Sequence, residues 1–215
     1  MKTPSPYLNE SPSQTAGPYV HIGCCPNFSG MSGVYAEDPG SNMISSDTRG
    51  ERIIIRGCVY DANNLPLTDA LLEIWQADAA GFHPGTEGDQ SDPEFANWGR
   101  CASDLSSGEF VFETIKPGAV AYPDGRLQAP HISVWIVARG INIGLNTRLY
   151  FDDESTANEN DPVLAMIEAR ARVATLIAST SSNASSGSNT SSGKPVEYRF
   201  DIYLQGPQET VFFDI

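Results

Sequence analysis

Residues 52–60 read Arg-Ile-Ile-Ile-Arg-Gly-Cys-Val-Tyr, and this run decides the fold class. Its β-branched residues favour a strand, and the Asp61-Ala62-Asn63-Asn64 segment directly after it favours a turn. Further short apolar runs, most of them bounded by Gly, Pro, Asp or Ser, lie at Leu71–Gln76, Phe110–Ile115, Ile132–Ala138, Thr147–Phe151, Tyr198–Leu204 and Thr210–Phe213. About seven strands with few helices predict a mainly β protein with a β-sandwich core, because a parallel α/β sheet needs helical crossovers.

The segment before this strand differs in character from the rest of the chain. Residues 1–50 are rich in Gly, Pro, Ser and Asn and show no sustained period. This composition predicts an extended N-terminal arm that makes subunit contacts, not a separate domain. Residues 51–215 are then expected to form one β-sandwich domain.

One helix is predicted late in the chain, packed on the sandwich. Asp161 suits an N-cap and Pro162 suits the first helical position. Apolar residues recur at helical spacing through to about Ala178, at Leu164, Ile167, Ala171 and Ala174. Residues 179–193 follow, almost all of them Ser, Thr, Asn or Gly, and predict a flexible loop without chemistry.

The charge of the chain limits its partners. Thirteen Lys and Arg against 27 Asp and Glu give a formal net charge of −14, which disfavours nucleic acid and anionic lipid. An anionic small substrate would need a deliberately placed cation. Met1–Pro18 has no apolar signal segment and no run is long enough to span a membrane, so we expect a cytoplasmic protein. The four cysteines are too few and too irregularly spaced for a disulfide framework or a zinc site.

Few residues suggest catalysis by this chain itself. The three histidines form no i, i+2 or i, i+4 pair, so a metal site built from His83 and His131 with tyrosines or carboxylates is the minority interpretation. The acidic run 152–154 is more typical of a solvated turn than of a cation site. Arg139 and Arg148 flank an apolar loop at 140–144, where a guanidinium could grip a carboxylate or form a surface ion pair.

Collinear motifs over nearly the whole chain are similar to one known family. The sequence resembles the α chains of the protocatechuate 3,4-dioxygenases, which are intradiol ring-cleaving dioxygenases. The segments that carry the resemblance are 13–23, 73–78, 114–119, 129–133, 138–144, 148–154, 198–202 and 209–215. Long collinear matches are more specific than a single short motif. The main departures are residues 31–48 and the Ser-rich loop.

The resemblance implies a bacterial hetero-oligomer in which a homologous β chain binds the iron. In that β chain, two tyrosines and two histidines hold Fe(III), and the matching positions here are His83, Val120, His131 and Ser133. Valine has no lone pair to donate, and a neutral serine hydroxyl is a poor ligand for Fe(III). We therefore expect this chain to bind no metal. Tyr122, two residues beyond Val120, is the one side chain that a loop shift could bring in.

The resemblance also implies a role in another chain's active site. The arm residues Thr15, Gly17, Pro18 and Tyr19 match a segment that reaches the β-chain pocket, and Arg139 matches an arginine that assists the substrate carboxylate. The implied reaction, a step of the β-ketoadipate pathway, cleaves 3,4-dihydroxybenzoate with O2 to 3-carboxy-cis,cis-muconate. No catalytic residue is expected in this chain, which alone should be inactive.

Two other functions remain open from the sequence. One is a homomeric dioxygenase with an altered metal site that uses His83, Tyr122 and His131. The other is a non-catalytic β-sandwich interaction module, in which the segment 15–19 would serve only interface packing.

Overall fold

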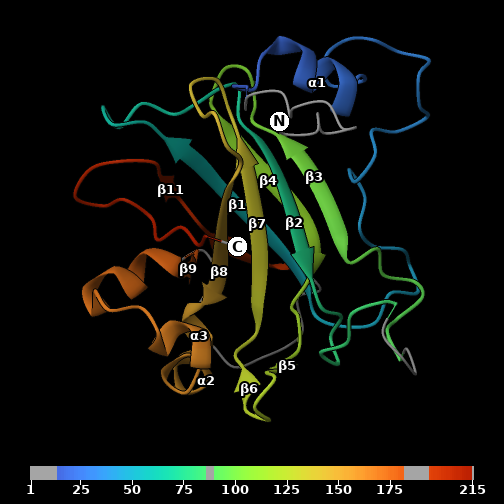
Figure 1. The fold of residues 1–215 in the computed structure, drawn as a ribbon. Helices are drawn as coiled ribbons and strands as arrows, with labels where there is room; N and C mark the ends of the chain where they lie inside the picture. Colours follow the sequence, from blue (N-terminus) through green and yellow to red (C-terminus); the bar gives the residue numbers. More distant parts are fainter. Residues whose placement is uncertain (1–13, 86–89, 182–193, 215) are drawn as a thin grey trace, which may run out of the picture.

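The computed structural model describes residues 14–85, 90–181 and 194–214 (Figure 1). The strands are β1 (Arg52–Tyr60), β2 (Leu71–Gln76), β3 (Trp98–Ala102), β4 (Glu109–Ile115), β5 (Val120–Ala121), β6 (Leu127–Gln128), β7 (His131–Val137), β8 (Leu145–Phe151), β9 (Ile177–Thr180), β10 (Val196–Arg199) and β11 (Ile202–Tyr203). The helices are α1 (Pro18–Cys24), α2 (Ser155–Glu159) and α3 (Pro162–Ala165), with 3₁₀ turns η1 (Asp152–Glu154) and η2 (Arg170–Leu176).

Nine of the described strands form one mixed sheet that folds over itself, and β5 and β6 form a separate two-stranded sheet. Hydrogen bonds connect them in the order β11-β1-β10-β9-β8-β7-β2-β3, with β4 on the other edge of β1. The strand β9 is the joint, because it runs antiparallel to β10 and parallel to β8. The β4-β1-β10 layer therefore lies across the β8-β7-β2-β3 layer (Figure 1), which confirms a mainly β fold of mixed topology.

The main hydrophobic core lies between these two layers. In β1 the buried residues alternate with half-buried ones up to Ile55, as expected for a strand with one face on a core. Side chains from both layers are buried in it, including Ile53, Phe110, Phe112, Leu72, Ile74, Ile132, Val134 and Ile136. Burial of each such side chain contributes about 1.5–3 kcal/mol, so the core fixes how the layers face each other.

The strand predictions are largely confirmed. The bounds of β1 and β2 are those predicted, and β4, β7 and β8 differ only at their ends. The predicted run 198–204 is divided into β10 and β11 at Phe200, whose backbone passes close to Gly57. The prediction of a strand at 210–213 is wrong, because within the described residues only a single bridge joins Asn146 to Phe213. The strands β3, β5, β6 and β9 were not predicted.

The helix prediction is confirmed at its start and wrong beyond Ala165. The Asp161 carboxylate caps α3 by accepting hydrogen bonds from the amides of Val163 and Leu164, both at 2.8 Å. The chain then forms η2 and enters β9, because β9 pairs with both β8 and β10 and this pairing overrides helical spacing. Ser179 and Thr180, predicted to be loop, belong to β9, and residues 182–193 lie outside the described part.

The described part of the N-terminal segment runs along the edge of β3. The Arg100 amide of β3 donates to the Gly40 carbonyl at 2.8 Å, and Met43 is buried in the main core. The helix α1 lies at one end of the sheet, opposite the β5–β6 hairpin (Figure 1). The domain division at residue 50 stays a prediction. Across the described ranges, no helix is long and apolar enough to cross a membrane.

Candidate functional site

The outer face of the β8-β7-β2-β3 layer carries most of the polar and aromatic side chains that suggest chemistry. Strand register places Trp75 opposite both Trp98 and Ser133, and Ser133 opposite Arg148. Directly paired residues point to the same face of a sheet, so these four form a row across it. Glu73, Trp135 and Asn146 form the next row in the same way.

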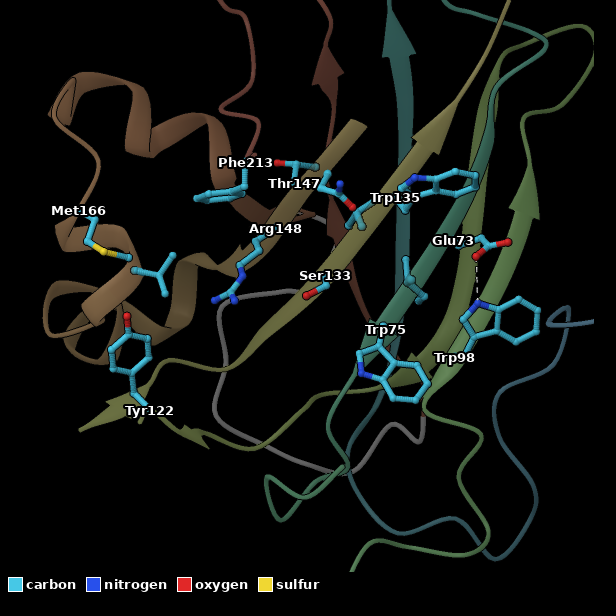
Figure 2. A pocket seen from close by; sticks show the side chains of 14 residues that line it. Glu73, Trp75, Trp98, Tyr122, Ser133, Trp135, Thr147, Arg148, Met166 and Phe213 are labelled. Carbon is cyan, nitrogen blue, oxygen red and sulfur yellow. Dashed lines mark hydrogen bonds between the residues drawn. The ribbon is translucent and has the colours of Figure 1, made fainter. Parts of the chain in front are cut away.

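A cavity of about 410 Å³ lies over these two rows. Its lining is mostly apolar, with Trp75, Trp98 and Trp135 on the sheet side (Figure 2). Tyr122, Met166 and Phe213 line it from the segments that surround the sheet. This size and lining are typical of a small-molecule pocket.

Two charged side chains line the cavity, and they differ in how they are neutralised. Glu73 accepts two hydrogen bonds from Arg100, at 2.8 and 2.6 Å, and one from the Trp98 indole at 3.3 Å. Arg148 donates from Nη1 to the Gln128 amide oxygen at 2.9 Å and to the Tyr150 hydroxyl at 3.4 Å. Glu73 is therefore compensated by a cation, whereas Arg148 has only neutral partners among the described residues.

His131 and Ser133 point to this same face, because they lie two residues apart in β7. The His131 ring is buried beside Tyr150, and its Nδ1 lies 2.7 Å from the Ala129 carbonyl oxygen. Burial, reinforced by the nearby Arg148 cation, lowers the pKa of His131 to about 4. The imidazole is therefore neutral at pH 7 and donates from Nδ1 to the carbonyl.

The other two implied positions lie on adjoining segments. His83 stacks on Trp75 with ring centroids 5.8 Å apart and an angle of 6° between the planes, and burial lowers its pKa. Val120 lies in β5, paired with Gln128 of β6, the residue that holds Arg148. Contacts through Trp75, Gln128 and Arg148 thus connect His83 and Val120 with Ser133.

The residues of this region do not fit a ferric ion. Val120 offers no donor atom, and the Ser133 hydroxyl stands beside the Arg148 cation where a metal would need an anionic ligand. Tyr122 does line the cavity together with Ser133, but its ring lies under the Arg126 guanidinium at 5.6 Å. Across the described ranges, no group of three or more His, Cys, Asp or Glu side chains could hold a metal ion.

A second group of predicted residues meets at the far end of β7. The Thr15 hydroxyl accepts a hydrogen bond from the Gly140 amide at 2.7 Å and donates to the Ala138 carbonyl at 3.4 Å. Arg139 lies between those two residues with its side chain 81% exposed, and its Nε is 3.3 Å from an Asp69 oxygen. The arm therefore contacts the turn that contains Arg139, through Thr15. Spacing along the sequence did not predict this contact.

The remaining arm residues form the start of α1. Gly17 is the N-cap residue, Pro18 begins the helix, and Tyr19 is 85% exposed. The side chain of Pro18 lies outside the described part. An aromatic side chain this exposed is available to a partner surface.

The two groups of residues lie apart. His131 begins β7 and Arg139 follows its end, so about 20 Å of strand separates them. Figure 1 shows α1 near one end of this layer and the β5–β6 hairpin near the other. Arg139 is not among the described residues that line the cavity.

The tryptophan walls were missed from the sequence. Trp75 and Trp135 are 42% and 37% exposed, although each lies inside a strand otherwise rich in buried residues. The signal was the spacing of two residues between Glu73 and Trp75 and between Ser133 and Trp135. Residues two apart in a strand share a face, so each polar residue places its aromatic neighbour on the face away from the core.

Sequence comparisons identify the family of the chain. A family model described as "Dioxygenase" matches residues 24–206. The chain is 44% identical to the protocatechuate 3,4-dioxygenase alpha chain of Pseudomonas putida, over 98% of this chain and 99% of that one. It is 39% identical to the alpha chain of Burkholderia cepacia, over 97% and 98%. The beta chain of Burkholderia cepacia is 34% identical, over 75% of this chain and 67% of that one.

Solved structures with the same fold are also dioxygenases. The dioxygenase domain of a carbohydrate-binding fusion protein from Streptomyces sp. SirexAA-E matches with a TM-score of 0.53 at 24% identity, over 94% of this chain and all of that one. Catechol 1,2-dioxygenase from Pseudomonas arvilla C-1 matches with a TM-score of 0.56 at 22% identity, over 79% and 58%. The chain therefore belongs to the intradiol dioxygenase family, and within it to the protocatechuate 3,4-dioxygenase α chains.

Proposed function

We propose that this chain is the non-iron-binding α subunit of a protocatechuate 3,4-dioxygenase and completes the substrate pocket of a homologous, iron-bearing β subunit. The complex would cleave 3,4-dihydroxybenzoate with O2 to 3-carboxy-cis,cis-muconate. The observation that carries the proposal is the exposed Arg139, held beside the arm by Thr15 at a distance from this chain's own cavity.

The poor fit of the residues around Ser133 to iron supports a complex in which a second chain binds the metal. Ring opening needs a ferric centre that binds the catechol oxygens, and the residues around Ser133 and Val120 do not provide one. The partner would supply that chemistry. Burkholderia cepacia has both an alpha chain and a beta chain that are similar to this chain, at 39% and 34% identity, which supports a partner of the beta type.

The electrostatics around Arg139 support a role in binding an anion. The chain has a net charge of −14, so a carboxylate substrate is repelled at long range. Arg139 has one carboxylate contact, through Nε at 3.3 Å, and its side chain is otherwise exposed. Its Nη atoms therefore remain available to a carboxylate. A charge-assisted hydrogen bond of this kind contributes about 1.5–3 kcal/mol.

The arm would fix the position of that guanidinium. Thr15 bonds to the residues on either side of Arg139, so the arm and the arginine form one unit. Tyr19, exposed four residues later, would pack on the partner and exclude water from the pocket. Interface packing alone is the simpler role for the segment 15–19, and the Arg139 experiment below separates the two.

A homomeric dioxygenase is the second candidate, favoured by the presence of Tyr122 in the same cavity as Ser133. It predicts a coloured enzyme that purifies as a single kind of chain. The α-subunit proposal predicts two different chains in equal amounts, so chain composition of the native enzyme distinguishes them.

The direct test is Arg139→Ala in the complex with the β chain. We expect the KM for 3,4-dihydroxybenzoate to rise about 10- to 100-fold, as loss of a charge-assisted hydrogen bond predicts. Arg56→Ala is the matched control, because Arg56 pairs with Glu109 and Glu197 on the other layer. An unchanged KM in the Arg139→Ala complex would favour a non-catalytic interaction module.

A second pair of variants tests the role of the arm. Thr15→Val removes both hydrogen bonds to the Arg139 turn, whereas Thr15→Ser keeps the hydroxyl. We expect Thr15→Val to raise KM in the same direction as Arg139→Ala but by less, with Thr15→Ser close to the parent. Equal behaviour of both variants would indicate that the segment serves only packing.

A further inference from the structure

The region that matches the iron site of the relatives is built around a cation. Arg148 is paired in register with Ser133, bonds to Gln128, which pairs with Val120, and contacts Tyr150, which is paired with His131. It thus touches or adjoins three of the four positions that match metal ligands. A guanidinium thus stands next to positions at which the resemblance implies metal ligands in the relatives.

This guanidinium is not neutralised by the protein. Within residues 14–85, 90–181 and 194–214, no carboxylate forms an ion pair with Arg148, although the chain has 27 acidic residues. Asp161 is linked to it only through the Tyr150 hydroxyl and already accepts three backbone hydrogen bonds. Glu73, the other charged residue of the cavity, is held by Arg100 at 2.6 Å. The cavity therefore carries an uncompensated positive charge.

The guanidinium is also oriented in advance. Both hydrogen bonds of Arg148 use Nη1, so Nε and Nη2 have no hydrogen-bond partner among the described residues. Those two nitrogens form an edge that matches the two oxygens of a carboxylate. Because Gln128 and Tyr150 hold the other nitrogen, little side-chain entropy is lost when an anion binds.

The walls of the cavity indicate what kind of anion fits. Trp75 and Trp135 provide flat apolar surfaces on the sheet side, and Met166 and Phe213 line other parts of the wall (Figure 2). Ser133 adds a hydroxyl group next to Arg148. One cation surrounded by aromatic rings favours a planar monoanion over a phosphate or a polyanion.

We propose that this cavity is a second ligand site, which binds a planar aromatic monocarboxylate through the guanidinium of Arg148 and the rings of Trp75 and Trp135. The site is separate from the one that Arg139 would serve, and it needs no metal. The inference does not rest on the proposed function, because all of its residues belong to this chain.

The test uses the full-length chain and 4-hydroxybenzoate, an aromatic acid that lacks the catechol pair. Binding is followed by quenching of tryptophan fluorescence and by calorimetry. We expect saturable binding, and at least about tenfold weaker binding of the neutral isostere 4-hydroxybenzamide, because only the acid can pair with Arg148. Equal affinity for acid and amide would overturn the proposal without any variant.

Variants then locate the site. Arg148→Gln is expected to weaken 4-hydroxybenzoate binding about tenfold or more, with Arg148→Lys in between. Arg56→Gln, which removes the same charge from the other layer, should leave binding unchanged. Unchanged binding in Arg148→Gln would contradict the proposal.

A further variant covers the case in which Arg148→Gln fails to fold, which circular dichroism would reveal. Trp75→Leu keeps an apolar side chain at the wall but removes the flat ring. We expect it to weaken 4-hydroxybenzoate binding several-fold and to remove most of the fluorescence change. Full retention of both affinity and signal would contradict the assignment of the cavity.

Discussion

At the scale of single residues, Asp161 connects the helix α3 to the site. It is fully buried, and it accepts hydrogen bonds from the amides of Ala129, Val163 and Leu164. Its Tyr150 contact, at 3.4 Å, leads on to Arg148. The sequence predicted the N-cap role from Asp161-Pro162, but the bond to Ala129, 32 residues earlier, depends on tertiary packing and had no sequence signal.

Replacing Asp161 with Ala should therefore destabilise the fold strongly. Three buried amides would lose their acceptor, and we expect a loss of about 3 kcal/mol or more in the free energy of unfolding. Asp104→Ala is the control, because Asp104 caps an exposed turn where water can replace it, and should cost about 1 kcal/mol. Urea unfolding of both variants measures this, and equal losses in the free energy of unfolding would contradict the role of Asp161 as a buried acceptor of three hydrogen bonds.

The Cys25 thiol provides a pH-dependent prediction. Burial and the nearby Asp38 charge raise the pKa of Cys25 to about 11 from an ordinary value of 9.0. The unfolded chain loses this proton first, so the native state binds more protons between pH 9 and 11. Stability is then complete below pH 9 and falls as the pH rises through this window.

We expect the free energy of unfolding of the parent protein to fall by about 2 kcal/mol more between pH 8.5 and 11 than that of a Cys25→Ala variant. Urea unfolding at the two pH values measures the difference, in which lysine and tyrosine titrations shared by both proteins cancel. The same loss in both proteins would show that the buried thiol is not responsible.

At the scale of elements, the sequence predicted strands better where they are long and β-branched. The run 52–60 matched β1, because a strand in the middle of the sheet needs apolar residues on its core face. The strand β9 had no such signal, since Ala and Ser favour helix or loop as readily as strand. It is a strand only because it pairs with β8 on one side and β10 on the other. The Trp98–Ala102 strand was missed for the same reason.

The candidate site, too, was predicted only in part from the sequence. The strand predictions located His131 at the start of a strand and Arg139 beside the loop that follows it. They did not predict that Arg148 stands beside Ser133, or that Thr15 reaches Arg139. Both contacts join segments far apart in sequence, so they follow from strand register and from the path of the arm.

Gly57 is the element-scale position most sensitive to substitution. A Cβ atom there would lie 1.8 Å from the Phe200 carbonyl oxygen and 2.6 Å from the Phe110 ring. Gly57→Ala should therefore push apart β1 and the chain between β10 and β11, at a cost of about 3 kcal/mol. Gly23→Ala, where nothing lies within 4 Å, is the control and should be neutral or stabilising. Thermal unfolding compares them, and a stable Gly57→Ala protein would contradict this close approach.

At the scale of the whole molecule, the two ends of one sheet layer carry different features. One end has the cavity, in which a guanidinium adjoins the positions that match metal ligands. The other end has an exposed arginine held by the N-terminal arm. A chain built in this way can contribute charge and shape to a partner while it provides no iron chemistry itself.

We infer that the partner chain binds the iron and this chain does not. Metal analysis of the full-length chain, expressed alone in iron-rich medium, tests this most directly. We expect far less than about one iron per chain, no colour from a phenolate–iron complex and no ring cleavage, because Val120 and Ser133 provide no anionic donors and Arg148 lies beside them. About one tightly bound iron per chain would contradict the account.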